Sequence, residues 1–86
     1  MKAPDAIFIG GGLSRETCDV CWEALRPLGR LVCNAVTLES EALLMALHKE
    51  HGGQLMKLQV NRAEPVGNLT GWRPLMPMTQ WSLVKR

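Results

Sequence analysis

The sequence of 86 residues contains no run of positively charged residues. Its ten Lys and Arg residues are scattered along the chain and nearly balanced by eight Asp and Glu residues, which leaves a net charge of +2. Nucleic-acid-binding proteins concentrate positive charge on one face, so we expect no nucleic-acid partner. The chain also lacks an apolar run of the roughly 20 residues that cross a bilayer, so we expect no membrane partner.

A disulfide framework and a secretion signal are missing as well. The three cysteines, Cys18, Cys21 and Cys33, are an odd number, and too few apolar residues stand near the N-terminus for a signal peptide. We therefore expect reduced thiols in a cytoplasmic protein. Hydrophobic residues make up 47% of the chain and charged residues 21%, which is typical of one small globular domain.

The hydrophobic pattern predicts two β-α units in the first part of the chain. Residues 6–9 are a continuous apolar run before three glycines, as in a buried parallel strand. A helix is predicted next, with Ser14 as its N-cap, Pro27 and Gly29 after its end, and one buried face formed by Cys18, Cys21, Trp22 and Leu25. Residues 30–36 are predicted to form a second strand, and a second helix runs from near Ser40 to His51.

The pattern changes in the second part of the chain. Residues 54–62 alternate between apolar and polar side chains, which indicates a half-exposed strand near a sheet edge. Residues 64–77 contain three prolines and two glycines, and we expect an irregular loop there. Residues 79–84 are predicted to form a last strand, antiparallel to 54–62 because no helix separates them. The fold class is α/β, in the order β-α-β-α-β-β.

Four stretches of the chain carry a family resemblance: residues 4–12 (PDAIFIGGG), 22–32 (WEALRPLGRLV), 34–40 (NAVTLES) and 71–81 (GWRPLMPMTQW). They resemble the decarboxylating precorrin-6Y C(5,15)-methyltransferases of cobalamin biosynthesis. The predicted order resembles the C-terminal half of a class I, Rossmann-like methyltransferase fold. The resemblance implies methyl transfer from S-adenosylmethionine to two ring carbons of a precorrin tetrapyrrole, with loss of a carboxyl group from an acetate side chain.

The resemblance also implies that residues 1–86 are a single partial domain without the N-terminal cofactor-binding half. Family enzymes hold the cofactor mainly through a glycine-rich turn and an acidic residue after their first two strands, and this chain contains neither. We expect the 86 residues to be inactive alone, and to form a homo-oligomer or associate with the missing half. The alternative is a non-catalytic α/β module that oligomerises or binds a partner through an exposed strand edge.

Candidate cofactor-binding residues follow the first two predicted strands. Gly10, Gly11 and Gly12 end one strand, and Asn34 and Thr37 end the next, at the edge where open α/β sheets bind ligands. The alternative for the glycines is a loop that needs positive φ angles. The alternative for Thr37, together with Glu39 and Ser40, is a helix N-cap.

The candidate substrate-binding residues are Glu39, Trp72, Arg73 and Met76. A tetrapyrrole with many carboxylates needs flat apolar contacts and guanidinium groups, and Trp72 and Met76 beside Arg73 offer both. The alternative is a proline-stiffened loop whose Trp and Met fill the core. No catalytic residue is assigned, because the conjugated macrocycle itself can take up the electron pair left by carbon dioxide.

We expect no metal site. Cys18 and Cys21 have the spacing of a metal motif, but both fall on the apolar face of a helix and are expected to be buried there. His48 and His51 lie at the end of the second predicted helix, where they interact favourably with its dipole.

Overall fold

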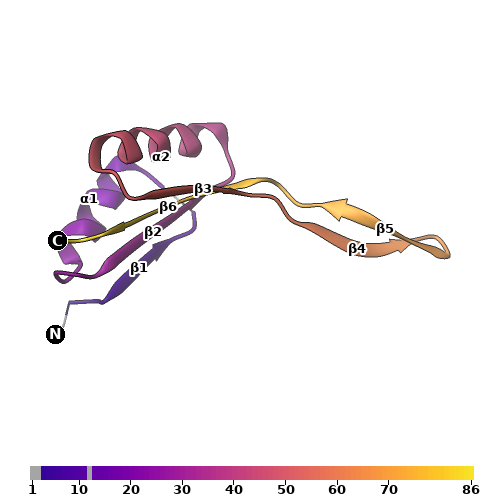
Figure 1. The fold of residues 1–86 in the computed structure, drawn as a ribbon, viewed down its shortest axis with the longest axis horizontal. Helices are drawn as coiled ribbons and strands as arrows, with labels where there is room; N and C mark the ends of the chain where they lie inside the picture. Colours follow the sequence, from indigo (N-terminus) through magenta and orange to yellow (C-terminus); the bar gives the residue numbers. More distant parts are fainter. Residues whose placement is uncertain (1–2, 12) are drawn as a thin grey trace.

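The computed structural model describes residues 3–11 and 13–86, which form a sheet, two helices and a projecting hairpin (Figure 1). The molecule measures 53 × 28 × 20 Å. In chain order the elements are β1 (Ala6–Ile9), α1 (Arg15–Ala24), β2 (Arg30–Ala35), α2 (Leu38–His51), β3 (Gln54–Leu58), β4 (Asn61–Val66), β5 (Leu69–Pro74) and β6 (Met78–Val84). Within the described ranges, neither helix has the length and hydropathy needed to span a membrane.

The main sheet has the strand order β1-β2-β6-β3. β1 runs parallel to β2, and β6 lies antiparallel between β2 and β3, so that Trp81 is flanked by Cys33 on one side and Leu55 on the other. The predicted antiparallel pairing of the last strand with the strand that begins at Gln54 is confirmed. β1, β2 and β3 therefore run in the same direction, and only β6 is reversed.

Both helices cover the same face of the sheet, and the core lies between them (Figure 1). Ser14 caps α1 as predicted, since its Oγ accepts a hydrogen bond from Thr17 N at 3.1 Å. Lys85 closes the other end of α1, where its ammonium donates to the carbonyls of Trp22 and Leu25. The core is formed by Ile9, Cys18, Leu25, Leu31, Cys33, Ala35, Leu44, Leu47 and Trp81.

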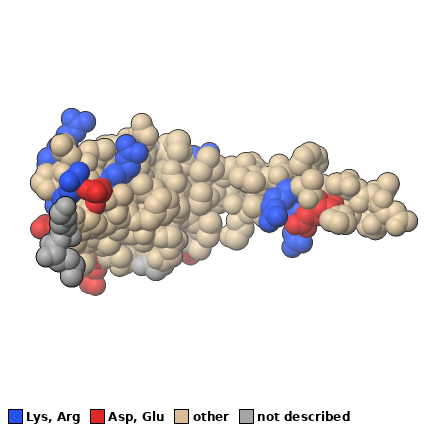
Figure 2. All heavy atoms as spheres, turned by 90° about the horizontal axis from the view of Figure 1, so that it is seen from below, with Lys and Arg blue, Asp and Glu red and all other residues tan. Residues whose placement is uncertain are grey.

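The opposite face of the sheet, the open face, is not covered by any described element. Ile7 and Ile9 point to the helices, whereas Phe8 points away from them and is 65% exposed. Met56 and Leu58 are also exposed, and Leu55 is the residue of β3 that packs against the core. The alternation thus predicts the edge strand correctly. Its core-facing side, however, is the one with Leu55, and Met56 lies on the exposed side. Figure 2 views the molecule from below Figure 1, where β1 lies lowest, and uncharged residues cover most of the body on this side.

Residues 61–74 form a two-stranded hairpin, the arm, which corrects the prediction of an irregular loop over 64–77 (Figure 1). Leu75 N donates to Val60 O at 2.8 Å, and hydrogen-bonded pairs alternate along an antiparallel ladder. Pro74 and Pro65 therefore fall at positions where a backbone N–H would point away from the partner strand. The prolines favour an irregular loop by composition alone, but their spacing is compatible with this ladder.

The turn before β2 contains Gly29, as expected, and also a residue with positive φ, Leu28, at +69°. A Cβ at Gly29 would lie 2.8 Å from Asp5 O, so glycine is needed there for the close approach of two backbone segments. A leucine with a left-handed backbone stores strain at the turn.

Candidate functional site

The carboxyl ends of β1 and β2 lie side by side, because Ile9 pairs with Cys33. Gly10 and Gly11 follow β1 at this edge, while Gly12 lies outside the described residues. A Cβ at Gly10 or Gly11 would meet nothing within 4 Å, and neither has a positive φ. A positive φ is therefore not the reason for these two glycines. They leave open backbone that a ligand or another chain segment can approach closely.

Asn34 stands in β2 at the same edge and is fixed by a residue that the sequence did not indicate. Its Oδ1 accepts a hydrogen bond from Gln80 Nε2 at 3.0 Å, across the β2–β6 pair. Because the oxygen accepts this bond, the amide offers a ligand its two N–H donors. The two residues are 46 positions apart in the chain, so only the register of the sheet brings them together.

Thr37 and Glu39 belong to the beginning of α2. Thr37 is its N-cap, and its Oγ1 accepts a hydrogen bond from Ser40 N at 3.2 Å. This is the capping alternative considered for Thr37, and it explains why α2 begins at Leu38, slightly before Ser40. Glu39 is exposed in the first turn, where its charge favours the helix dipole. Both side chains therefore have a structural role in the helix.

Glu41 is a second residue that the sequence did not single out. Thr79 Oγ1 donates to Glu41 Oε2 at 2.6 Å, and the Lys57 ammonium pairs with the same oxygen. These hydrogen bonds, that from Lys57 foremost, hold the pKa of the Glu41 carboxyl below its ordinary range. Glu41 is consequently a weak proton acceptor, and it ties the first turn of α2 to β3 and β6.

The arm carries two of the candidate substrate-binding residues, Trp72 and Arg73, and Met76 follows it. Trp72 is 76% exposed and Met76 is 65% exposed, so the alternative that they fill the core is wrong. Trp72 and Arg73 are consecutive in β5 and point to opposite faces of the arm. Arg73 Nη1 lies 3.4 Å from Glu64 Oε2. The structure does not gather these residues and Glu39 into one pocket within residues 3–11 and 13–86.

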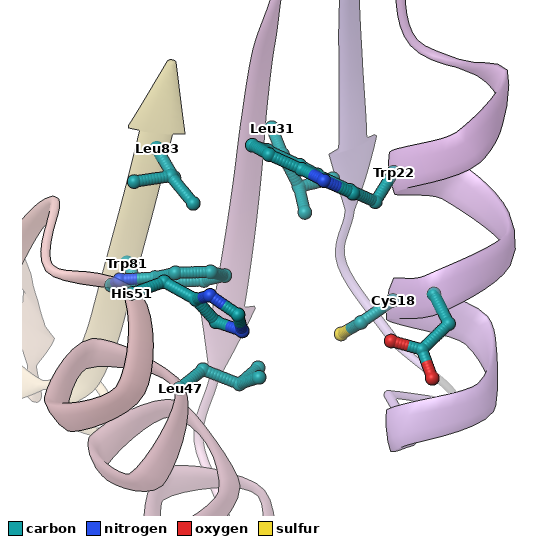
Figure 3. A pocket seen from close by; sticks show the side chains of 8 residues that line it. Cys18, Trp22, Leu31, Leu47, His51, Trp81 and Leu83 are labelled. Atoms are coloured by element: carbon teal, nitrogen blue, oxygen red, sulfur yellow. The ribbon is translucent and has the colours of Figure 1, made fainter. Parts of the chain in front are cut away.

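A hollow between α1 and α2 lies on the helix-covered side of the sheet (Figure 3). Its volume of about 70 Å³ suits a few water molecules and is far too small for a nucleoside. Cys18 lines it, and Cys33 is fully buried nearby in the core. Burial raises the pKa of both thiols, that of Cys33 to about 12. No group of three or more His, Cys, Asp or Glu in the described part of the chain is arranged to hold a metal ion.

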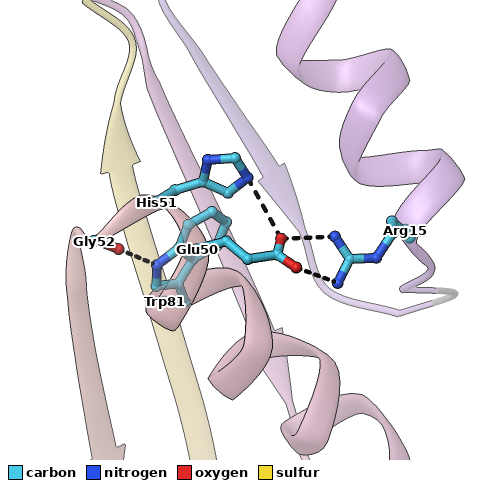
Figure 4. Close-up of polar contacts among 5 residues, drawn as sticks. All are labelled: Arg15, Glu50, His51, Gly52 and Trp81. Atoms are coloured by element: carbon cyan, nitrogen blue, oxygen red, sulfur yellow. Dashed lines mark hydrogen bonds and ion pairs between the residues drawn. The ribbon is translucent and has the colours of Figure 1, made fainter.

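An ion pair between Arg15 and Glu50 joins α1 to α2 (Figure 4). Arg15 Nη1 and Nη2 donate to the two carboxylate oxygens of Glu50 at 2.8 and 3.3 Å, so the pair is bidentate. The guanidinium holds the pKa of the Glu50 carboxyl below its ordinary range. His51 follows Glu50 and packs at a tilt against Trp81, with ring centroids 6.5 Å apart. His51 thus has a structural place at the end of α2.

The fold defines a class: the C-terminal half of a Rossmann-like methyltransferase fold. A SAM-dependent O-methyltransferase from Thermotoga maritima shows the same fold, with a TM-score of 0.58 at 22% identity, over 99% of this chain and 35% of that one. More specifically, the chain belongs to the precorrin methyltransferase domain family, whose model matches residues 1–85.

Two relatives within this family are close in sequence. A precorrin-6Y C(5,15)-methyltransferase [decarboxylating] from Sinorhizobium is 52% identical over 86 residues, which are 99% of this chain and 21% of the relative. The crystal structure of the C-terminal domain of precorrin-6Y C5,15-methyltransferase from Rhodobacter capsulatus has a TM-score of 0.85 at 49% identity. That match covers 99% of this chain and 46% of the domain. The chain thus corresponds to a C-terminal part of longer relatives.

Proposed function

We propose that this chain is the C-terminal portion of an enzyme that methylates a precorrin with S-adenosylmethionine and removes a carboxyl group from it in cobalamin biosynthesis. The observation that carries this proposal is the edge of the sheet where open glycine backbone lies beside a fixed amide. Ligands of open α/β sheets bind at this edge. The name of the 52% identical relative from Sinorhizobium supports the choice of substrate.

The residues at this edge fit the cofactor. S-adenosylmethionine supplies an electrophilic methyl group, which passes to a ring carbon of the substrate and leaves S-adenosylhomocysteine. Gly10 and Gly11 let the backbone approach a bound ligand without a Cβ in the way. The Asn34 amide, oriented by Gln80, donates hydrogen bonds to the ligand from the end of β2. Such a site works mainly by positioning its reactants.

Two uncovered surfaces support the expected partners. The relatives are longer than this chain, and we propose that the additional part of the fold packs on the open face, which exposes Phe8 and Met56. The arm is an isolated two-stranded hairpin, which is marginally stable in water, and it exposes Val66, Leu69 and Trp72. We propose that its tip packs on a second copy in a homo-oligomer. The three unbridged cysteines fit a reducing cytoplasm.

The proposed function can be tested in a chimera. The matching segment of the Sinorhizobium enzyme would be replaced by this chain, which the 52% identity makes feasible. Methyl transfer from radiolabelled S-adenosylmethionine to precorrin-6Y and the release of carbon dioxide would be measured. We expect both activities in the chimera. Asn34→Ala should weaken the binding of S-adenosylhomocysteine, measured by calorimetry, whereas Asn68→Ala at the tip of the arm should not.

A chimera that folds and binds S-adenosylhomocysteine but gives no methylated product would contradict the proposal. Calorimetry and light scattering on the 86-residue chain test the partner part separately. We expect little binding of S-adenosylhomocysteine by the chain alone and a mass above that of the monomer. A monomer at every concentration would contradict the proposed homo-oligomer.

A further inference from the structure

Two arginines face each other at the base of the arm. Arg62 in β4 is directly opposite Arg73 in β5, and both are exposed. Glu64 is the only other charged residue between Asn61 and Pro74 in the sequence. Figure 2 shows the charged side chains of the arm gathered in one group, separate from those of the body. Arg62 was not among the residues that the sequence indicated.

The two positive charges of Arg62 and Arg73 are not balanced by an equal number of nearby carboxylates. Like charges directly opposite each other on neighbouring strands destabilise the pairing. Glu64 is the partner of Arg73, at 3.4 Å, and one carboxylate cannot balance two guanidinium groups. Among residues 3–11 and 13–86, no carboxylate lies within 4.0 Å of the Arg62 guanidinium. The base of the arm therefore keeps one positive charge that an anionic group can neutralise.

The sheet topology places this charge near the candidate site. Ala35 at the end of β2 pairs with Thr79, and Leu58 at the end of β3 pairs with Met78. The arm therefore leaves the sheet at the edge where β1 and β2 end (Figure 1). A hollow of about 320 Å³ lies on the arm itself and is lined in part by Glu64, Trp72 and Arg73, whereas Arg62 stands outside it. A large ligand bound at Gly10 and Asn34 would lie at the same ends of the strands from which the arm projects.

We propose that Arg62 and Arg73 bind carboxylate side chains of the tetrapyrrole substrate, an inference that rests on the proposed function. The planar guanidinium group matches a carboxylate with two parallel N–H donors, which makes arginine better suited to this task than lysine. Glu64 holds the Arg73 guanidinium at the arm and competes with the incoming carboxylate. It thereby lowers the affinity for anions in general and favours a ligand that presents several acid groups together.

The proposal is tested by titrating the 86-residue chain with uroporphyrin, a tetrapyrrole with an acetate and a propionate on every ring, followed by porphyrin fluorescence. We expect Arg62→Gln and Arg73→Gln each to weaken binding about five- to tenfold, as for the loss of a charge-assisted hydrogen bond. Glu64→Gln should tighten binding about two- to threefold, because it removes the competing carboxylate. Coproporphyrin, which has only the propionates, should bind more weakly and depend less on the two arginines.

The matched control is Arg30→Gln, which removes the same charge at the start of β2, at the opposite edge of the sheet. We expect unchanged uroporphyrin binding in this variant. Either of two results would overturn the proposal. One is an equal loss of affinity in all three arginine variants, which would show non-specific attraction; the other is full affinity in Arg62→Gln or Arg73→Gln. If a Gln variant fails to fold by circular dichroism, Arg73→Lys keeps the charge without the planar fork, and we expect it to lose part of the affinity.

This titration contains no methyl donor, so its outcome is separate from that of the chimera. A chimera without methyl transfer, combined with arginine-dependent uroporphyrin binding, would refute the proposed function and leave the acid-binding pair in place. An active chimera whose chain binds uroporphyrin equally well without Arg62 and Arg73 would refute the pair alone.

Discussion

Trp81→Phe should be among the most damaging single substitutions in this chain. Trp81 stands in β6, between β2 and β3, and is only 2% exposed. Its indole Nε1 donates to Gly52 O at 2.8 Å and so fixes the end of α2 against the sheet (Figure 4). Phenylalanine keeps an aromatic ring in the core, but it has no donor and leaves space unfilled.

Two costs add up in this variant. Removing the indole donor costs about 0.5–1.5 kcal/mol, the net value of a hydrogen bond, because Gly52 is exposed and water can bind its carbonyl oxygen instead. The smaller ring leaves a deficit of roughly 40 Å³, which costs about 1 kcal/mol at ~24 cal/mol per Å³ of cavity. This space adjoins the hollow that Trp81 lines. We expect a loss of about 1.5–2.5 kcal/mol in the free energy of unfolding, a substantial share of the roughly 5–15 kcal/mol typical of a domain.

The assay is urea unfolding followed by far-UV circular dichroism at fixed protein concentration, with Val20→Ala as the control. Val20 is 69% exposed in α1 and lies outside the surfaces proposed to bind a partner or a ligand, so its replacement should change the free energy of unfolding by no more than about 0.5 kcal/mol. With a slope of about 2 kcal/mol per M, in the middle of the usual range, the Trp81→Phe midpoint should fall by about 1 M. Equal midpoints for the two variants would refute the assignment of Trp81 as the residue that locks α2 to the sheet.

Three further predictions concern single residues. Cys18 and Cys33, whose pKa values burial raises, should resist iodoacetamide at neutral pH in the folded chain and react after unfolding in urea, as counted by mass spectrometry. Leu28→Gly should raise the free energy of unfolding by about 1 kcal/mol, because glycine relieves the left-handed backbone, and an unchanged urea midpoint would contradict the strain. The pKa values of Glu41 and Glu50 are lower in the folded chain than in the unfolded chain. Stability should therefore be constant above the ordinary glutamate pKa and fall as the pH drops through the lowered values; Glu41→Gln should flatten this decline in urea midpoints measured against pH.

The elements with a clear local signal were predictable from the sequence. The apolar run before Gly10 gave β1, and Ser14 with the spacing of Cys18 and Leu25 gave α1, because short-range periodicity and capping decide such segments. The arm was not predictable in the same way. A proline breaks a hairpin only where its missing N–H would have bonded to the partner strand. Whether Pro65 and Pro74 fall at such positions depends on which pairs of the ladder are hydrogen-bonded, and composition does not reveal this.

The residues of the candidate site also fall into those that a local sequence pattern reveals and those that it does not. Gly10, Gly11 and Asn34 could be named because they follow predicted parallel strands, and the edge rule needs only the strand order. Gln80 and Glu41 could not be named, because their contacts join residues 46 and 38 positions apart. These contacts depend on the register of β6 in the sheet and on how α2 lies across it, and neither is encoded in a local pattern.

The position of the arm follows from topology rather than from any signal within it. β3 runs in the direction of β1 and β2, and β6 returns antiparallel beside it, so their connection must lie at the carboxyl edge. A hairpin inserted into that connection projects from the carboxyl ends of these strands whatever its sequence. The proposed substrate binding then needs only two residues at the base of the arm, and Arg62 and Arg73 occupy that place. A hairpin of the same sequence inserted between α2 and β3 would project from the opposite ends of the strands, away from the proposed ligand-binding residues Gly10 and Asn34.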